Sequence, residues 1–286
     1  MPLVTSKKIV DQAKLDGVGV VGFDVLDLIS VEAALGAAHK ANAPLLLMVP
    51  EASFGHIDVG SFSTYLVDRA SRADVDVAVH LDHGESLETV KRVIDLGYTS
   101  VMFDGSALPL EQNIEETAKI AEYARAAGVS VEAEIGHVAG GEGDMDGAEI
   151  ETDLFTDPTE AEVFARETGV DMLAVAFGTV HGVYKGEPNL DLERLQAIRD
   201  RLDIPLVMHG GSGLSDQQYR DVIKHGIHKI NLFTNISIAA VSKAVDHALA
   251  KERKLHFAEL LAVGQMTTQA MLAHYYQVFT ESNDQS

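Results

Sequence analysis

Short apolar runs alternate with longer amphipathic stretches along the whole chain. Several of these runs are nearly continuous and rich in β-branched residues, which is typical of parallel strands covered on both faces. The runs occupy residues 18–23, 44–49, 75–81, 100–103, 129–134, 172–177, 204–208 and 229–232. Their order predicts eight strand-then-helix units, spaced roughly thirty residues apart.

The stretches between the runs carry helix boundary signals. Asp157 and Pro158 precede a helical pattern over residues 159–167, with proline at the first helical position. Ser215 and Asp216 precede another over 217–225, which Gly226 ends. These units predict an α/β fold, a (β/α)₈ TIM barrel; a doubly wound sheet is the alternative, but it usually has fewer strands. We expect residues 1–286 to form one domain, with an extra helix over 257–279 and a polar tail at about 281–286.

Gly17, Gly19 and Gly22 match the spacing G-x-G-x-x-G. A dinucleotide-binding loop needs these glycines after a strand and at the start of a helix. Here they lie within an apolar run, so we interpret them as part of a tight barrel strand.

Composition and charge narrow the function. The chain has 286 residues, of which 46% are hydrophobic and 23% charged, values typical of a folded domain. It has 22 Lys and Arg against 44 Asp and Glu, a net charge of −22, which argues against binding to nucleic acid or to anionic membranes. An anionic substrate therefore needs a local positive site on an acidic protein.

The chain contains no cysteine, so disulfides, thiolate zinc sites and cysteine nucleophiles are excluded. No apolar run approaches the roughly 20 residues of a membrane span. The first residues lack the charged-then-apolar order of a signal peptide, so we expect a cytoplasmic protein.

Three histidines follow three different predicted strands, and each precedes a glycine: His83, His181 and His209. Active sites of TIM barrels lie at these strand ends. Three neutral imidazoles with an open fourth position make a catalytic zinc set. The chain has 12 histidines, and for any single one an ordinary role in a loop or in the core is the alternative. Three histidines at equivalent strand ends favour a metal site.

Carboxylates accompany the histidines. Asp82 is a candidate acid/base, or alternatively orients a metal-bound histidine. Strand alternation does not put Asp82 and His83 on one side, so we expect the strand to break at residues 83–84. Asp104 and Glu134 also follow strands, and we expect them to accept hydrogen bonds around the metal ligands.

A glycine-rich segment, residues 209–213, follows the seventh predicted strand, and residues 231–234 end the eighth. Loops at these two places commonly form the phosphate site of this fold. Two ordinary turns are the alternative. Together with a metal and Lys185, such loops would provide the local positive site.

These segments together resemble the class II, zinc-dependent ketose-bisphosphate aldolases of the short fructose- or tagatose-bisphosphate type. The resemblance covers about residues 18–235, and its most specific pieces are residues 80–84, 100–106, 131–136, 181–186 and 209–213. It implies reversible cleavage of a ketose 1-phosphate or 1,6-bisphosphate to dihydroxyacetone phosphate and an aldehyde. It implies Zn²⁺, or another divalent metal, on His83, His181 and His209, with Na⁺ or K⁺ nearby. A homodimer or homotetramer is also expected.

The resemblance assigns further roles. Asp82 would exchange the proton of the hydroxyl that becomes the aldehyde. The residues matching the phosphate site are Gly182, Gly210, Gly211, Ser212, Asn231 and Thr234.

The chain also departs from the family pattern. Gly143 stands where the family has a carboxylate that takes the carbon-bound proton, and Glu142 and Asp144 are the candidates to replace it. Phe233, Asn235, Pro50 and Asp24 are further departures, mostly toward the aldehyde half of the substrate.

Three alternatives stay open at this point. A zinc-dependent barrel hydrolase usually has a His-x-His pair on the first strand, which is absent here. A Schiff-base aldolase needs an inward lysine, and we expect Lys229 at the start of its strand. A catalytically weakened sugar-phosphate-binding relative is favoured only by Gly143 and Phe233.

Overall fold

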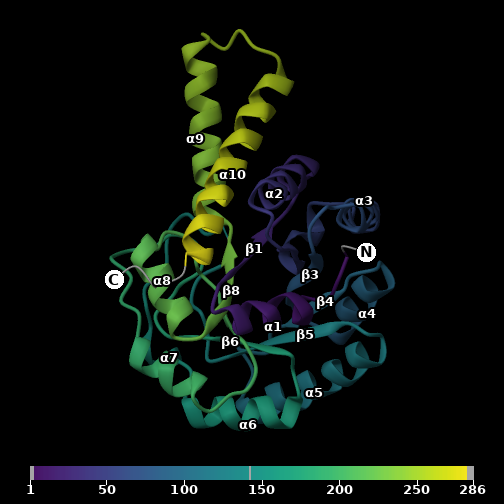
Figure 1. Ribbon diagram of the computed structural model, residues 1–286, viewed down its shortest axis with the longest axis vertical. Coiled ribbons are helices and arrows are strands. Elements are labelled where there is room, and N and C mark those ends of the chain that lie inside the picture. The colour runs from purple at the N-terminus through teal and green to yellow at the C-terminus, as the bar shows by residue number, and fades with distance from the viewer. Residues whose placement is uncertain (1–2, 142, 282–286) are drawn as a thin grey trace.

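The computed structural model describes residues 3–141 and 143–281. In this part of the chain, parallel strands pair in chain order and close into a barrel, because β1 pairs with both β2 and β8 (Figure 1). The predicted TIM barrel is confirmed. Its strands are β1 Val20–Asp24, β2 Leu45–Pro50, β3 Val77–Gly84, β4 Ser100–Phe103, β5 Ser130–Ile135, β6 Met172–Val175, β7 Leu206–Met208 and β8 Ile227–Leu232.

Helices surround the barrel and connect its strands (Figure 1). Both helix starts predicted from the sequence are confirmed, because the Asp157 side chain accepts from the amides of α6 and Ser215 forms a capping box with Gln218 at α8. The helices are α1 Ser6–Asp16, α2 Leu28–Ala41, α3 Val59–Ser71, α4 Leu87–Asp95, α5 Leu110–Ala126, α6 Pro158–Thr168, α7 Leu192–Arg199, α8 Asp216–Lys224, α9 Thr234–Ala250 and α10 Phe257–Thr280, with the 3-10 helices η1 Glu51–Gly55 and η2 Thr152–Leu154.

The glycine motif near the N-terminus is divided between two elements. Gly17 ends α1 in the left-handed conformation, with φ 67°, and β1 begins only at Val20. Our expectation that the whole motif is strand was therefore wrong at its first half, because α1 was not predicted. No helix begins at these glycines, in contrast to a dinucleotide-binding loop.

Helix α1 closes the N-terminal end of the barrel. Its Ile9, Val10 and Ala13 are buried against inward-facing apolar residues of the strands. At the same end, the Ser6 hydroxyl lies 2.5 Å from that of Ser100 and 2.7 Å from that of Ser130. Apolar side chains of α1 and of the strands, together with these three hydroxyls, therefore fill the N-terminal end of the barrel.

Replacing Ile9 with alanine should lower the free energy of unfolding by about 2–4 kcal/mol, because it leaves a cavity in this packed end. Urea denaturation monitored by circular dichroism measures the change. Leu15→Ala is the matched control, since Leu15 lies on the same helix with 80% of its surface exposed, and it should change stability by less than about 0.5 kcal/mol. Equal losses in both variants would show that α1 does not seal the barrel.

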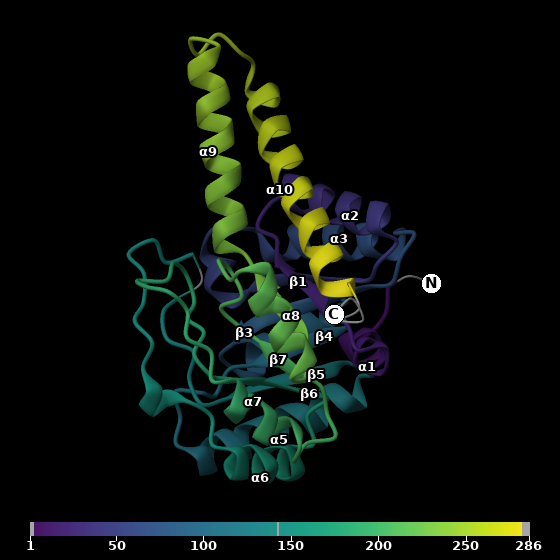
Figure 2. The ribbon, with the colours of Figure 1, turned by 60° about the vertical axis from the view of Figure 1, so that its left-hand side comes forward.

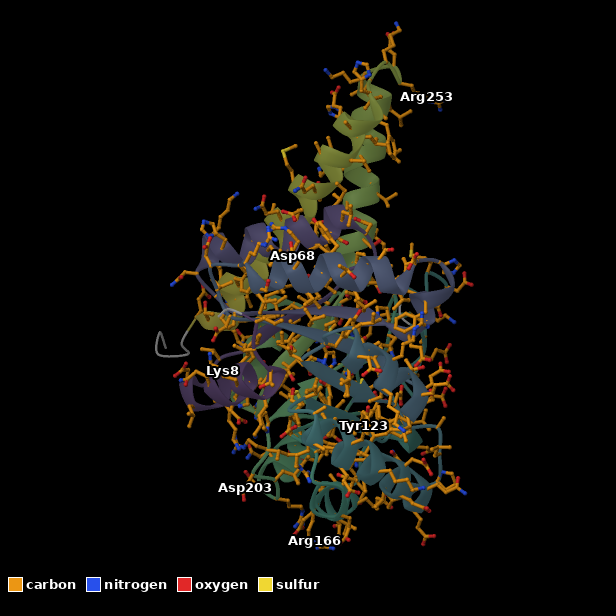
Figure 3. The ribbon with its side chains drawn as sticks, turned by 90° about the vertical axis from the view of Figure 1, so that its right-hand side faces the viewer. Lys8, Asp68, Tyr123, Arg166, Asp203 and Arg253 are labelled. Carbon is orange, nitrogen blue, oxygen red and sulfur yellow. The ribbon has the colours of Figure 1, made fainter. Side chains whose placement is uncertain are left out.

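Helices α9 and α10 form a hairpin that projects well beyond the barrel (Figures 1, 2 and 3). We call this hairpin, α9 together with α10, the arm. The last turns of α10 return to the barrel, where Leu272, Tyr276 and Phe279 are buried. The helix expected over residues 257–279 is thus present as α10. Of the expected polar tail, Glu281 is described and residues 282–286 lie outside the described part.

No described helix combines the length and apolar character needed to cross a membrane.

Candidate metal centre and active site

A bulge in β3 brings two successive side chains to the same site. Leu81 pairs with Val101 and Gly84 with Phe103, so β3 has one more residue than β4 over this interval. His83 adopts φ 45°, a left-handed conformation that is uncommon for a residue other than glycine. Our expectation that the strand breaks at residues 83–84 was wrong, since β3 continues to Gly84. The extra residue of the bulge nevertheless brings the side chains of Asp82 and His83 to the same site, as the break was expected to do.

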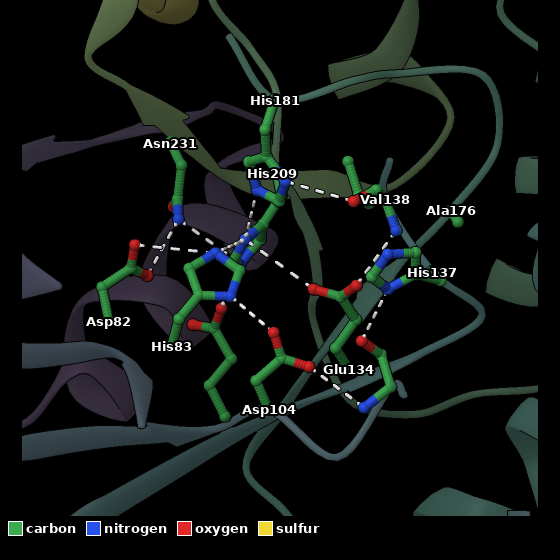
Figure 4. Close-up of polar contacts among 12 residues, drawn as sticks. Asp82, His83, Asp104, Glu134, His137, Val138, Ala176, His181, His209 and Asn231 are labelled. Carbon is green, nitrogen blue, oxygen red and sulfur yellow. Dashed lines mark hydrogen bonds and ion pairs between the residues drawn. The ribbon is translucent and has the colours of Figure 1, made fainter. Parts of the chain in front are cut away.

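Three imidazole nitrogens converge above the barrel core (Figure 4). His209 Nδ1 lies 2.9 Å from His83 Nε2 and 3.4 Å from His181 Nε2. Tetrahedral zinc with ligands at 2.0–2.1 Å places its nitrogens about 3.3 Å apart. The three nitrogens therefore have the spacing of a single metal site.

Each histidine uses its other ring nitrogen to bond an acceptor. His83 Nδ1 lies 2.7 Å from an Asp104 oxygen, and His181 Nδ1 lies 3.2 Å from the Val138 carbonyl. His209 Nε2 lies 2.9 Å from Glu132 Oε1. Acceptors at these nitrogens fix the tautomers and leave the converging nitrogens with their lone pairs, which is what a divalent metal requires.

The electrostatics of the cluster favour a bound cation. Burial lowers the pKa of His181 and His209 well below the ordinary value, so both rings are neutral and each has a nitrogen lone pair for a metal. For His83, burial acts in the same direction, but Asp82 and Asp104 outweigh it and raise the pKa. Burial, followed by the charge of Asp104, raises the pKa of Glu134 to about 8. Positive charge at the three nitrogens would relieve this carboxylate repulsion.

The residues therefore fit zinc. His83, His181 and His209 have ligand atoms within 4.8 Å of one another, and all of these atoms are nitrogens. Carboxylates bond the outer ring nitrogens of two of them, Asp104 that of His83 and Glu132 that of His209. A second set, His83, Asp104 and Glu134, has the same compactness and shares His83 with the first.

Asp82 lies beside this cluster at the C-terminal end of β3. It is fully buried, and its Oδ1 accepts a hydrogen bond of 3.2 Å from Asn231 Nδ2 (Figure 4). Its Oδ2 lies 3.8 Å from His83 Nε2. A buried carboxylate next to a metal position has the placement of an acid/base group.

The glycine-rich loop after β7 approaches neighbouring backbone closely. A Cβ on Gly210, which has φ +64°, would collide with the Val180 carbonyl, and one on Gly211 would meet the Asn231 carbonyl at 2.7 Å. The Ser212 hydroxyl accepts a bond of 3.2 Å from the Phe233 amide. The structure thus brings Gly210 against Val180, and Gly211 and Ser212 against the end of β8.

Helix α9 starts at this same place with Thr234, and no described side chain caps its first turn. Its free backbone N–H groups and its dipole suit a phosphate. Gly182, which follows β6 and has φ +78°, lies against the Asp144 backbone. These are the geometric features expected of the predicted phosphate site.

Lys185 is exposed, and its aliphatic stem lies against the Gly147 backbone. Glu142 lies outside the described residues. The Phe233 ring lies 3.4 Å from where a Cβ on Gly143 would be, so two departures from the family pattern pack against each other.

Our reading of the sequence missed a buried group beneath the histidines. Glu132 bonds His209 through one oxygen, and Lys229 Nζ lies 2.7 Å from its other oxygen. Lys229 does not start its strand, as we expected, but lies inside β8 and is fully buried. The alternation of side chains along a strand could have identified both residues. Glu132 lies two positions before Glu134 on β5, and Lys229 lies two positions before Asn231 on β8, so each pair shares one face of its strand.

Comparisons with known proteins decide the family. The model of the family described as fructose-bisphosphate aldolase class-II matches residues 4–284. The chain belongs to this family. The class II aldolase is 41% identical over 261 residues to fructose-bisphosphate aldolase of Geobacillus stearothermophilus, covering 90% of this chain and 89% of that one. It is 39% identical to the enzyme of the same name from Staphylococcus epidermidis, with the same coverage.

A comparison with a solved structure supports the same family. The YdjI aldolase of Escherichia coli K12 matches with a TM-score of 0.87 at 30% identity, covering 99% of this chain and 100% of that chain. The class II aldolase is thus an aldehyde-lyase of carbohydrate metabolism that cleaves a ketose bisphosphate. The hydrolase alternative is not favoured.

Proposed function

We propose that this aldolase works with Zn²⁺ held by His83, His181 and His209. The observation that carries the proposal is the convergence of one nitrogen from each ring, while the other nitrogen of each ring bonds an acceptor. When bound, zinc would polarise the ketose carbonyl and stabilise the negative charge that develops on cleavage.

The chain's own residues perform the remaining steps. Asp82 takes the proton from the hydroxyl on the fourth carbon while the bond between the third and fourth carbons breaks. That carbon becomes the aldehyde, and the electron pair stays on the three-carbon fragment. Asn231 orients Asp82 through its amide N–H, which leaves the other carboxylate oxygen for the proton.

The phosphate of the three-carbon fragment is proposed to lie among Gly182, Gly210, Gly211 and Ser212 at the open end of α9, with Thr234. The close approaches at Gly210 and Gly211 leave no room for side chains, and we propose that backbone N–H groups of this loop bind the phosphate. Na⁺ or K⁺ beside this phosphate is part of the proposal, as is a contribution from Lys185 after a loop movement.

The carbon-bound proton needs a separate carrier, because residue 143 is glycine. We propose that Glu142 or Asp144, on the same loop, takes this role. Asp144 supports this, since it packs against Gly182 and its backbone N–H and C=O bond Gly141 and Val183. Asp104 and Glu134 are proposed to hold and balance the metal ligands rather than carry protons.

Zinc content and cleavage test this function together. The purified full chain should contain about one zinc per chain, and a coupled assay should detect triose phosphate release from ketose phosphates. Removal of zinc with EDTA should abolish release, and added Zn²⁺ should restore it. Full zinc occupancy without any cleavage would instead indicate the sugar-phosphate-binding alternative.

We also propose that the chain is a single domain that acts in the cytoplasm as a homodimer, or as a homotetramer built from it. The arm supports self-association. Val241, Val245 and Leu249 recur every four residues on α9 and are 49–60% exposed, so they form one apolar stripe.

Replacing Val245 with aspartate should therefore shift the protein toward monomers at micromolar concentration, because it places a charge in the apolar stripe. Sedimentation velocity gives the distribution of species. Leu108→Asp, at a partly exposed position outside the arm, is the control and should leave the assembly unchanged. An unaltered oligomer in Val245→Asp would exclude this stripe as the interface.

A further inference from the structure

The glycine-rich loop after β7 contains two backbone N–H groups that the described part of the chain leaves without a hydrogen-bond acceptor. They belong to Gly211 and Ser212, which are both buried. An N–H group in a buried residue costs free energy when it has no acceptor, so a ligand that accepts from both groups would stabilise the loop. The phosphate proposed above is such an acceptor.

Two tyrosine hydroxyls hold the carbonyls of this loop. Tyr184 Oη donates to the Gly210 carbonyl at 2.7 Å, and Tyr219 Oη donates to the Gly211 carbonyl at 2.5 Å. Tyr184 follows β6 and Tyr219 lies on α8, so the two bonds come from different elements. Burial raises the pKa of both hydroxyls above the ordinary value, which keeps them protonated as donors.

The planarity of the peptide bond converts these two bonds into an orientation of the N–H groups. In a trans peptide the C=O of one residue and the N–H of the next point in opposite directions, and no described peptide bond is cis. The bond to the Gly210 carbonyl therefore directs the Gly211 N–H away from Tyr184. In the same way, the bond to the Gly211 carbonyl directs the Ser212 N–H away from Tyr219. Because glycine has the widest backbone freedom, the loop depends on such bonds for a fixed orientation.

Aromatic contacts fix the ring of Tyr219. Its centroid lies 5.5 Å from that of Tyr275 and 5.2 Å from that of Phe279, and all three side chains are buried. We call these three residues the aromatic cluster. The Tyr275 hydroxyl accepts a bond of 2.5 Å from Asn235 Nδ2 in the first turn of α9. The aromatic cluster therefore supports both parts of the proposed phosphate site, the loop after β7 and the N-terminus of α9.

Tyr184 is held separately from the aromatic cluster. Its hydroxyl accepts a bond of 3.4 Å from the Val180 amide, and its backbone pairs with Ala148 in an isolated parallel bridge. Either hydroxyl can therefore be removed while the other stays in place.

We propose that Tyr184 and Tyr219 are positioning residues for the substrate phosphate, and that they act by directing the N–H groups of Gly211 and Ser212 toward it. The proposal rests on the phosphate site assigned above. Neither hydroxyl touches the substrate, because each donates its proton to a loop carbonyl. Loss of either hydroxyl should weaken phosphate binding and leave the metal ligands and Asp82 in place.

Replacement of each tyrosine with phenylalanine removes the hydroxyl and keeps the ring. In the zinc-loaded full chain, Tyr219→Phe and Tyr184→Phe should each raise KM for proton exchange of dihydroxyacetone phosphate about tenfold and change kcat less than about twofold, because the phosphate is remote from the reacting carbon. The inhibition constant of inorganic phosphate, which contains only the group in question, should rise by a similar factor.

Tyr98→Phe is the matched control. Tyr98 is also buried, it precedes β4 at the end of the barrel opposite the proposed site, and its hydroxyl accepts a bond of 3.2 Å from Ser63. This variant should leave both KM and the inhibition constant unchanged. All variants should contain about one zinc per chain. If Tyr219→Phe does not fold, the partly buried Tyr184 still provides the test.

The possible outcomes separate this proposal from the proposed function. An unchanged KM and an unchanged inhibition constant in the folded tyrosine variants overturn this proposal alone. A lower kcat with an unchanged KM also overturns it, because the hydroxyls would then affect the reacting carbon or the metal ligands instead of the phosphate. Absence of exchange in the zinc-loaded wild type overturns the proposed function and this proposal with it.

Discussion

Replacing His209 with alanine should remove the bound zinc and lower the rate of ketose phosphate cleavage by at least about 10³-fold. His209 Nδ1 is the nitrogen closest to both partners, so its loss leaves two ligands that cannot hold the metal tightly. The metal contributes several kcal/mol of charge stabilisation, and each 1.36 kcal/mol corresponds to a tenfold change in rate.

Zinc content by mass spectrometry and cleavage by the coupled assay measure the two effects. His274→Ala is a matched control, because His274 is half exposed on the arm and pairs with Asp216 away from the site. Since His209 is fully buried above Glu132, circular dichroism must show that the variant is folded. A folded His209→Ala protein that retains one zinc per chain is incompatible with the ligand assignment.

Asp82→Asn should retain zinc but reduce cleavage by about 10²–10⁴-fold, the usual contribution of general acid–base catalysis. The amide has nearly the shape of the carboxylate and can still accept from Asn231, so the local packing is kept. It cannot take the hydroxyl proton. Proton exchange of dihydroxyacetone phosphate, which has no such hydroxyl on a fourth carbon, should be much less affected.

Comparison of cleavage with exchange gives the measurement for Asp82. Asp95→Asn, at an exposed carboxylate at the end of α4, is the control and should leave both rates unchanged. Equal loss of cleavage and exchange would show that Asp82 acts through the metal ligands instead of on the hydroxyl. A cleavage rate close to that of the wild type would remove Asp82 from the mechanism.

Local signals in the sequence were sufficient for the barrel and for several helix ends. Apolar runs indicate buried parallel strands wherever they occur, and Asp157 and Ser215 satisfy free amides of the helices that follow them. The histidines could be placed at one mouth because all parallel strands of a barrel end on the same face.

The tertiary structure alone decided the rest. The bulge that brings both Asp82 and His83 to the site depends on the pairing of β3 with β4. The choice of His209 Nδ1 as the converging nitrogen depends on Glu132 from β5, which Lys229 from β8 holds in turn. The sequence by itself determined the barrel and which residues reach its mouth, because periodicity and capping act over a few residues. Which ring nitrogens converge depends on contacts between strands far apart in the chain, and these exist only once the barrel has closed.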